Sequence, residues 1–178
     1  YVDGDLYETV SYDYDAEVTA IAEPEKTGYT FGGWIGVPDT MPAEDVVVTG
    51  VFTIDTFEVA FFYNEGEQIG ATQIVEYNEA ATAPTAPEVE GYTFVGWDAT
   101  FDHVRENLNV SAVYAVNTYT IAYYVEGDMY EVVGYEYNTA VVAIEDAVKV
   151  GYSFNGWVGV PDTMPAEDLI VTGTFTID

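Results

Sequence analysis

Apolar and polar residues alternate along two segments of the chain, residues 56–63 and 118–125. The apolar positions are Phe57, Val59, Phe61 and Tyr63 in the first segment and Tyr119, Ile121, Tyr123 and Val125 in the second. Alternation with period two among β-branched and aromatic residues is typical of a strand with one buried face. We therefore predict a half-buried strand in each segment.

A triplet of an acidic residue, a glycine and a second acidic residue follows each segment, and it also occurs near the N-terminus. The triplets are Asp3-Gly4-Asp5, Glu65-Gly66-Glu67 and Glu126-Gly127-Asp128. Glycine adopts the positive φ that tight hairpins require without steric cost. Each triplet therefore predicts a hairpin turn into a second strand, such as residues 6–12.

The next stretch resembles a short helix in one place only, VVAIEDAVKV at residues 141–150. Pro24 and Pro87 occupy the position of Ala147 in related segments, and Pro84 occupies that of Ile144. A proline inside a helix costs about 3 kcal/mol. We therefore expect this stretch to be extended or to form a single loose turn.

The motif Gly-Tyr-x-Phe-x-Gly-Trp occurs at residues 28–34, 91–97 and 151–157. Large aromatic side chains bury much apolar surface, so we expect these rings to dominate each small core. The alternative is that they form a stacking platform for sugars. The rings are Tyr29, Phe31, Trp34, Tyr92, Phe94, Trp97, Tyr152, Phe154 and Trp157.

The string GVPDTMPAED occurs twice without change, at residues 36–45 and 159–168. Residues 38–40 favour a turn, and residues 42–45 favour one helical turn because a proline near its start precedes acidic residues. The last strand is then expected to begin at Val46. We interpret the string as a strand connector, because it holds no combination of catalytic residues.

These patterns divide the chain into three repeats of about sixty residues. Their predicted bounds are 1–55, 56–117 and 118–178. The first repeat begins at Tyr1, which corresponds to Tyr124, so it lacks the residues that start the first strand. Asp178 corresponds to Asp55, after which a further repeat begins. We therefore expect the sequence to be part of a longer array.

The chain is strongly acidic, with 32 Asp and Glu against 3 Lys and Arg and a net charge of −29. Nucleic acids and anionic membrane surfaces would be repelled, so neither is expected as a partner. Because 49% of the residues are hydrophobic, the chain is nevertheless expected to fold. Without cysteine it forms no disulfide. No apolar run is long enough to cross a bilayer, so we expect no membrane insertion.

Together, the hairpin, the Gly-Tyr-x-Phe-x-Gly-Trp motif and the Met-Pro-Ala-Glu-Asp string resemble the Listeria/Bacteroides repeat, the module of the internalin B-repeat. The second repeat departs from this pattern with ATFDHVREN at residues 99–107. A lysine often precedes the motif in such repeats; Lys26 and Lys149 match it, but Val89 does not. The resemblance implies an elongated array of mainly β, β-grasp-like (ubiquitin-like) repeats on secreted bacterial surface proteins. Such proteins are attached to the cell wall through other regions, and the family has no catalytic residues.

Enzymatic function is not expected, and no cofactor is predicted. His103 is the sole histidine and lies in the divergent connector, so a histidine-based triad is not repeated. The turn acids could bind Ca²⁺ weakly; the alternative is a solvated turn without an ordered ion. The candidates are Asp3, Asp5, Glu65, Glu67, Glu126 and Asp128.

Two hypotheses of function follow. In the first, the repeats form a stalk or spacer of an adhesive surface protein, kept extended by like charges. In the second, they form an adhesive module that binds a host surface protein, a glycan or another copy of the chain. If the first repeat lacks its first strand, a strand from another chain could fill that place.

Overall fold

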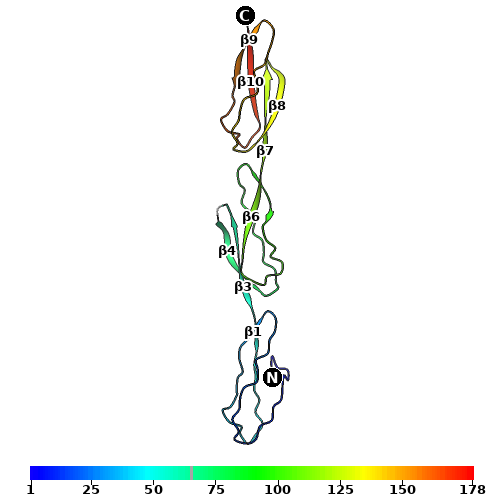
Figure 1. Cartoon of the computed structure of the whole chain (residues 1–178), viewed down its shortest axis with the longest axis vertical. Coiled ribbons are helices and arrows are strands. Elements are labelled where there is room, and N and C mark those ends of the chain that lie inside the picture. Colours follow the sequence, from blue (N-terminus) through cyan, green and yellow to red (C-terminus); the bar gives the residue numbers. More distant parts are fainter. Residues whose placement is uncertain (65) are drawn as a thin grey trace. The chain divides into compact units, whose positions relative to one another are not determined.

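The structure is a computed structural model, and it describes residues 1–64 and 66–178. The described residues form ten β-strands and no helix (Figure 1), which confirms the prediction of a mainly β chain. The strands are β1 Tyr29–Phe31, β2 Phe52–Ile54, β3 Thr56–Tyr63, β4 Glu67–Glu76, β5 Tyr92–Trp97, β6 Leu108–Val116, β7 Thr118–Val125, β8 Asp128–Glu136, β9 Tyr152–Val158 and β10 Leu169–Ile177.

The strands of the third repeat form one mixed sheet in the order β8-β7-β10-β9. The central strands β7 and β10 run parallel, and the two outer strands pair antiparallel with them. Ile121 and Tyr123 of β7 are fully buried, as the period-two alternation predicts. Strands of the second repeat take the equivalent order β4-β3-β6-β5, again with a parallel central pair.

The predicted acidic turns are two-residue hairpins in the first and third repeats. Asp3 and Gly4 have φ of 51° and 94°, and Glu126 and Gly127 have φ of 52° and 95°. Positive φ at both central residues is the type I′ geometry, which matches the twist of paired strands. In the second repeat Gly66 also has a positive φ, while Glu65 lies outside the described residues.

The proline-containing stretch is not helical, as expected, and residues 141–148 contain no regular secondary structure. The helical turn predicted in the connector is wrong, because residues 43 and 44 form only a bend. The backbone of Met41 explains this difference. Its N–H donates to Ala16 O at 2.9 Å and its carbonyl accepts from Asp15 N at 2.9 Å, so these groups bond across the repeat.

Fully buried side chains come mainly from the first and last strands and the connector. In the third repeat they are Ile121, Tyr123, Met164 and Val171, and in the second they include Val59, Phe61, Val104 and Val110. The nine rings of the Gly-Tyr-x-Phe-x-Gly-Trp motif were expected to dominate the core, but none of them is fully buried. Tyr92, Phe94 and Tyr152 are exposed. The reason is that the central strands are covered on both edges, whereas the motif lies on an edge strand.

The first repeat has less regular structure than predicted. Only β1 and β2 pair as strands, residues 6–12 form no strand, and β2 begins well after Val46. In the third repeat the equivalent residues of β8 and β10 pair with β7. In the first repeat only Tyr1 and Val2 correspond to β7. The strands expected at residues 6–12 and from Val46 therefore lack the strand with which their backbone N–H and C=O groups would pair.

The chain divides into two compact units. The first contains Tyr1–Phe62, Gly66–Pro84 and Ala99–Ser111, and the second contains residues 63–64, Thr85–Asp98 and Ala112–Asp178. The division passes through the second repeat: β3 up to Phe62, β4 and the connector belong to the first unit, and β5 and residues 112–116 of β6 belong to the second. Every contact described below lies within one unit.

Candidate functional site

The lysine that precedes the motif contacts both the hairpin turn and the rings. Lys26 Nζ lies 3.9 Å from the centre of the Tyr29 ring, 5.4 Å from that of Phe52 and 3.6 Å from Asp3 Oδ2. A cation over an aromatic face is attracted by the electron density of the ring. The lysine therefore connects the turn to the edge of the sheet.

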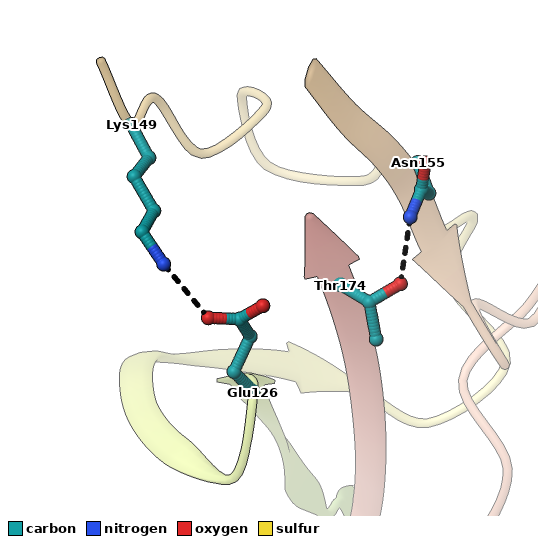
Figure 2. Close-up of polar contacts among 4 residues, drawn as sticks. All are labelled: Glu126, Lys149, Asn155 and Thr174. Atoms are coloured by element: carbon teal, nitrogen blue, oxygen red, sulfur yellow. Dashed lines mark hydrogen bonds and ion pairs between the residues drawn. The ribbon is translucent and has the colours of Figure 1, made fainter. Parts of the chain in front are cut away.

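The third repeat reproduces this cluster, and Figure 2 shows its ion pair between Lys149 and Glu126. Lys149 Nζ lies 3.0 Å from Glu126 Oε2, 4.2 Å from the centre of the Tyr152 ring and 5.5 Å from that of Phe175. The side chains of Lys149 and Glu126 are 43% and 44% exposed, so the pair contributes at most roughly 1 kcal/mol. The second repeat has Val89 at this position.

Two of the proposed calcium ligands, Asp3 and Glu126, make other polar contacts. Asp3 Oδ1 accepts a hydrogen bond from Phe52 N at 3.0 Å, and Glu126 pairs with Lys149. Asp5, Glu67 and Asp128 are exposed, and Glu65 lies outside the described residues. Among residues 1–64 and 66–178, no three His, Cys, Asp or Glu side chains come together as a metal site. Weak Ca²⁺ binding stays a prediction.

The tryptophans of the motif hold the proline-containing stretch against the sheet. Trp34 Nε1 donates to Ile21 O at 3.0 Å and Trp157 Nε1 to Glu145 O at 3.4 Å. The same rings pack edge-to-face against Phe31 and Phe154, with centroids 5.0 and 4.9 Å apart. These contacts give the tryptophans a structural role.

The connector contributes two side chains to the third repeat. Met164 is 1% exposed and packs in the core. Asp168 Oδ1 accepts hydrogen bonds from Thr120 N at 2.7 Å and Thr120 Oγ1 at 3.0 Å, at the start of β7. In the second repeat Asn107 Oδ1 takes this position and accepts from Glu58 N at 2.9 Å. The repeated string thus places a core residue and a strand cap, and His103 of the divergent connector is exposed.

A groove lies beside the core of the first repeat, with a volume of about 400 Å³. Its lining combines residues 6–12, the proline-containing stretch and the connector, and it includes Leu6, Val10, Trp34, Met41 and Val48. In the third repeat, β7 packs between the equivalent segments. The groove is therefore bordered by the segments that correspond to β8 and β10 of the third repeat.

The end of the first repeat is closed by a set of hydrogen bonds around Asp55. Its N–H donates to Gly28 O at 2.9 Å, and its Oδ1 accepts from Thr30 Oγ1 at 2.6 Å. Its carbonyl accepts from the N–H of Tyr77, in the second repeat, at 2.8 Å. The Tyr77 ring lies directly on Gly28, where a Cβ atom would overlap it.

Asn117 forms the same set between the second and third repeats. Its N–H donates to Gly91 O at 2.8 Å, its Oδ1 accepts from Thr93 Oγ1 at 2.6 Å, and its carbonyl accepts from Tyr137 N at 2.9 Å. The Tyr137 ring covers Gly91, which is buried. It also packs edge-to-face against Tyr92 at 5.9 Å.

These junction residues were not predicted from the sequence, although a signal was present. A tyrosine between two acidic or amide residues recurs at the same place in every repeat, as Asp13-Tyr14-Asp15, Glu76-Tyr77-Asn78 and Glu136-Tyr137-Asn138. The recurrence had no interpretation without knowledge of the glycine that the ring covers.

Three segments of the chain match the model of the Listeria-Bacteroides repeat domain, at residues 2–50, 57–112 and 119–168. The chain belongs to this repeat family. The resemblance drawn from the motifs is therefore confirmed, and the tandem repeats of the Listeria-Bacteroides type span most of the sequence.

Named relatives are longer proteins. Internalin H of Listeria monocytogenes is 34% identical over 110 residues, which cover 50% of this chain and 20% of the internalin. Two proteins of Evansella cellulosilytica, named "Putative Gly-rich membrane protein" and "Putative membrane protein", are 30% and 26% identical over 85% and 86% of this chain. The chain spans 20% and 27% of their lengths. Within its own described residues, no helix is long and apolar enough to cross a membrane.

Proposed function

We propose that this chain is a non-catalytic repeat region of a bacterial surface protein and acts as a stalk or spacer that supports adhesion. The observation that carries the proposal is the repeated junction. Asp55 and Asn117 make the same hydrogen bonds at the ends of successive repeats, and a tyrosine covers a glycine at both places. Reuse of one junction is typical of arrays in which each repeat contacts only its neighbours, and such an array suits a stalk.

The location proposed for the protein is the bacterial cell surface, with attachment to the wall through regions outside this chain. Its membership of a repeat family that also occurs in internalin H supports this location. An acidic exterior, with a net charge of −29, would keep neighbouring molecules apart and disfavour binding to nucleic acid.

We assign each complete repeat to the β-grasp-like class. The support is the sheet order β4-β3-β6-β5 in the second repeat and β8-β7-β10-β9 in the third, with first and last strands parallel at the centre. A catalytic role is not part of the proposal. The described cationic side chains Lys26, Arg105 and Lys149 contact neighbouring acids, amides or rings.

Small-angle X-ray scattering of the purified chain tests the stalk. Three repeats in line give a radius of gyration of about 25–30 Å, whereas one compact body of this length gives about 16 Å. The larger value is expected. The smaller value would overturn the stalk and direct attention to surfaces formed by packing of the repeats on one another.

A second candidate function is adhesion by strand addition, and the groove of the first repeat favours it. A peptide with the sequence of residues 118–123 carries the alternation that the groove residues meet in the third repeat. If the groove accepts strands, this peptide should raise the melting temperature of the chain, and a scrambled peptide should not. Equal effects of the two peptides would refute strand addition. Host proteins and glycans remain proposed partners of the adhesive module.

A further inference from the structure

One turn precedes the aromatic motif in every repeat. The residue at the start of this turn is Lys26, Val89 or Lys149. Its carbonyl accepts a hydrogen bond from the N–H of the motif tyrosine, at 3.0, 3.0 and 3.1 Å respectively. The backbone of the second repeat therefore brings Val89 to the place from which the two lysines of the other repeats reach their rings.

The rings that receive the lysines are also present in the second repeat. Three aromatic pairs lie opposite each other in antiparallel strands, with ring centroids 5.3, 5.7 and 5.3 Å apart: Phe31 and Phe52, Phe94 and Tyr114, and Phe154 and Phe175. The motif tyrosine stands two residues before the first ring of each pair. Lysine ammonium groups lie over these tyrosines in the first and third repeats, whereas Val89 has no ammonium to place there.

A pocket of about 580 Å³ lies at this place in the second repeat. Tyr92 is 40% and Phe94 39% exposed, so both rings are accessible. The Tyr114 hydroxyl donates to Pro87 O at 2.6 Å, which fixes the proline-containing stretch beside the rings. All the lining residues belong to the second compact unit. We call this hollow the ring pocket; its lining includes Glu88, Val89, Glu90, Tyr92, Phe94 and Tyr114.

The charge of the ring pocket favours a cation. Among the described residues that line it, Glu88 and Glu90 are acidic and none is basic. The second repeat contains a single Lys or Arg, and this residue, Arg105, donates to Asn78 Oδ1 at 2.8 and 3.1 Å. Aromatic faces and carboxylates both attract cations, and a net charge of −29 repels anions.

We propose that the ring pocket binds a lysine side chain of a protein partner. The ammonium of this lysine lies over Tyr92, in the position that the lysines of the other repeats occupy over their motif tyrosines at 3.9 and 4.2 Å. Glu88 and Glu90 attract the same charge. The proposal names the chemistry of a protein partner for the adhesive module, so it rests on that second candidate function and not on the stalk.

The adjoining junction is compatible with a cation in the ring pocket. Tyr137 packs edge-to-face against Tyr92 at 5.9 Å. In the first repeat Tyr77 forms the same junction while Lys26 lies over Tyr29. A junction tyrosine and a cation on the motif tyrosine therefore occur together in this chain.

NMR titration of the full chain with Nα-acetyl-lysine methylamide tests the proposal, because amide signals locate the probe and also measure its affinity. In about 0.15 M salt, charges more than roughly 8 Å apart are screened. The shifts should be largest at residues 91–94 and saturate with a dissociation constant of roughly 1–10 mM. Nα-acetyl-norleucine methylamide has a comparable aliphatic chain without the ammonium, and it should bind at least about fivefold more weakly.

Two variants change the occupancy of the pocket in opposite directions. Val89→Lys supplies the lysine of the other repeats from within the chain, so it should weaken binding of the probe by at least about fivefold. Val95→Lys is the matched control, because Val95 is 60% exposed on the same strand and does not line the pocket. It adds the same charge and should change the affinity by less than about twofold. Lys149→Val should open an equivalent pocket in the third repeat, with new shifts at residues 151–154.

Three results would overturn the proposal. They are the absence of a saturable shift at residues 91–94 up to about 50 mM probe, equal binding of the lysine and norleucine probes, and equal binding to the Val89→Lys and Val95→Lys chains. Methyl glucoside is titrated in parallel. If this sugar binds at residues 91–94 at least as tightly as the lysine probe, the ring pocket is assigned to glycans instead. The stalk is tested separately, because the radius of gyration is measured on the chain without any probe.

Discussion

At the scale of single residues, the connector methionine has the clearest structural role. Met164 fills the centre of the third repeat, and its N–H and carbonyl bond to Thr139 O and Asn138 N at 2.9 and 2.8 Å. Val104 makes the equivalent bonds to Glu79 and Asn78 in the divergent second connector and is 0% exposed. An apolar side chain at this point is therefore retained when the rest of the string changes.

Replacement of this methionine tests its role in the core. Met164→Ala leaves a cavity among Ile121, Tyr123 and Val171, so we expect a loss of roughly 2–4 kcal/mol in the free energy of unfolding. Met129→Ala is the matched control, because Met129 is 65% exposed and its loss should change stability by less than about 0.5 kcal/mol. Denaturant unfolding followed by tryptophan fluorescence measures both. Equal losses would contradict the assignment of Met164 to the core.

Tyr123 has a buried hydroxyl group without a hydrogen bond among the described residues. Tyr135 and the backbone of Ile144 lie near the hydroxyl and influence its pKa in opposite directions, but the hydroxyl forms no hydrogen bond with either. Burial raises the pKa of Tyr123 above the ordinary value of 10.0. The second repeat has Phe61 at the equivalent position, where it is 1% exposed.

Tyr123→Phe should therefore raise the free energy of unfolding by roughly 0.5–2 kcal/mol, since it removes a buried polar group without a partner. Tyr135→Phe is the control of opposite sign, because the Tyr135 hydroxyl donates to Val142 O at 2.9 Å. Its loss should lower stability by roughly 0.5–1.5 kcal/mol. Calorimetry measures the stability of the two variants. If Tyr123→Phe is less stable than the original chain, the Tyr123 hydroxyl has a hydrogen-bond partner.

The raised pKa of Tyr123 also gives a pH dependence with a definite sign. Above pH 10 the unfolded chain loses the Tyr123 proton before the folded chain does, so the folded state binds more protons and stability falls as pH rises. Below pH 10 this contribution is constant. Tyr123→Phe should reduce the slope of stability against pH above 10 and leave it unchanged below.

At the scale of elements, the junctions depend on glycine. Gly28 and Gly91 have φ of 78° and 75°, and both lie beneath a tyrosine ring. A side chain at either position would adopt a strained backbone conformation and also displace the ring. At a junction the motif glycine is therefore required for two reasons: it allows the positive φ, and it leaves room for the tyrosine ring of the next repeat.

Gly91→Ala should cost roughly 2–4 kcal/mol, the sum of backbone strain and displacement of Tyr137. Gly151→Ala is the matched control with the same φ and no ring above, and it should cost only about 1–2 kcal/mol. In the double variant Gly91→Ala/Tyr137→Ala the displacement disappears, so the two losses should not add. If denaturant unfolding shows that the two losses of stability add, Gly91 and Tyr137 do not interact.

At the scale of the whole molecule, charge dominates. The two described salt bridges involve Lys26 and Lys149, and most acidic side chains face solvent among other acids. Repulsion of this size destabilises the compact state and is screened by salt.

Melting temperature should therefore rise with NaCl, by at least about 2 °C for each kcal/mol of repulsion that is screened. CaCl₂ and MgCl₂ at matched ionic strength separate screening from specific binding by the turn acids. Equal effects of the two salts are expected for diffuse screening. A larger effect of Ca²⁺, lost in Asp128→Asn, would assign a specific site, and no response to any salt would contradict the role of repulsion.

Local patterns in the sequence determined the repeats, the family, the buried strands, the glycine turns and the absence of helix in the proline-containing stretch. Period-two alternation and glycine φ are properties of a few neighbouring residues, so they can be read without the fold. Tertiary structure decided that residues 6–12 form no strand, that Met164 is buried and that Tyr92 is exposed. Each depends on a partner strand or on edge position, which lies far away in the sequence.

The junctions show the same limit. Nothing near Tyr77 or Tyr137 in the sequence identifies Gly28 or Gly91 as the surface that each ring covers. That pairing arises because the preceding repeat brings its motif glycine to the point where the next repeat begins its Tyr-containing turn. The sequence by itself determined that there are repeats, and only the tertiary structure decided how one repeat is joined to the next, because the joining contacts link residues that are distant along the chain.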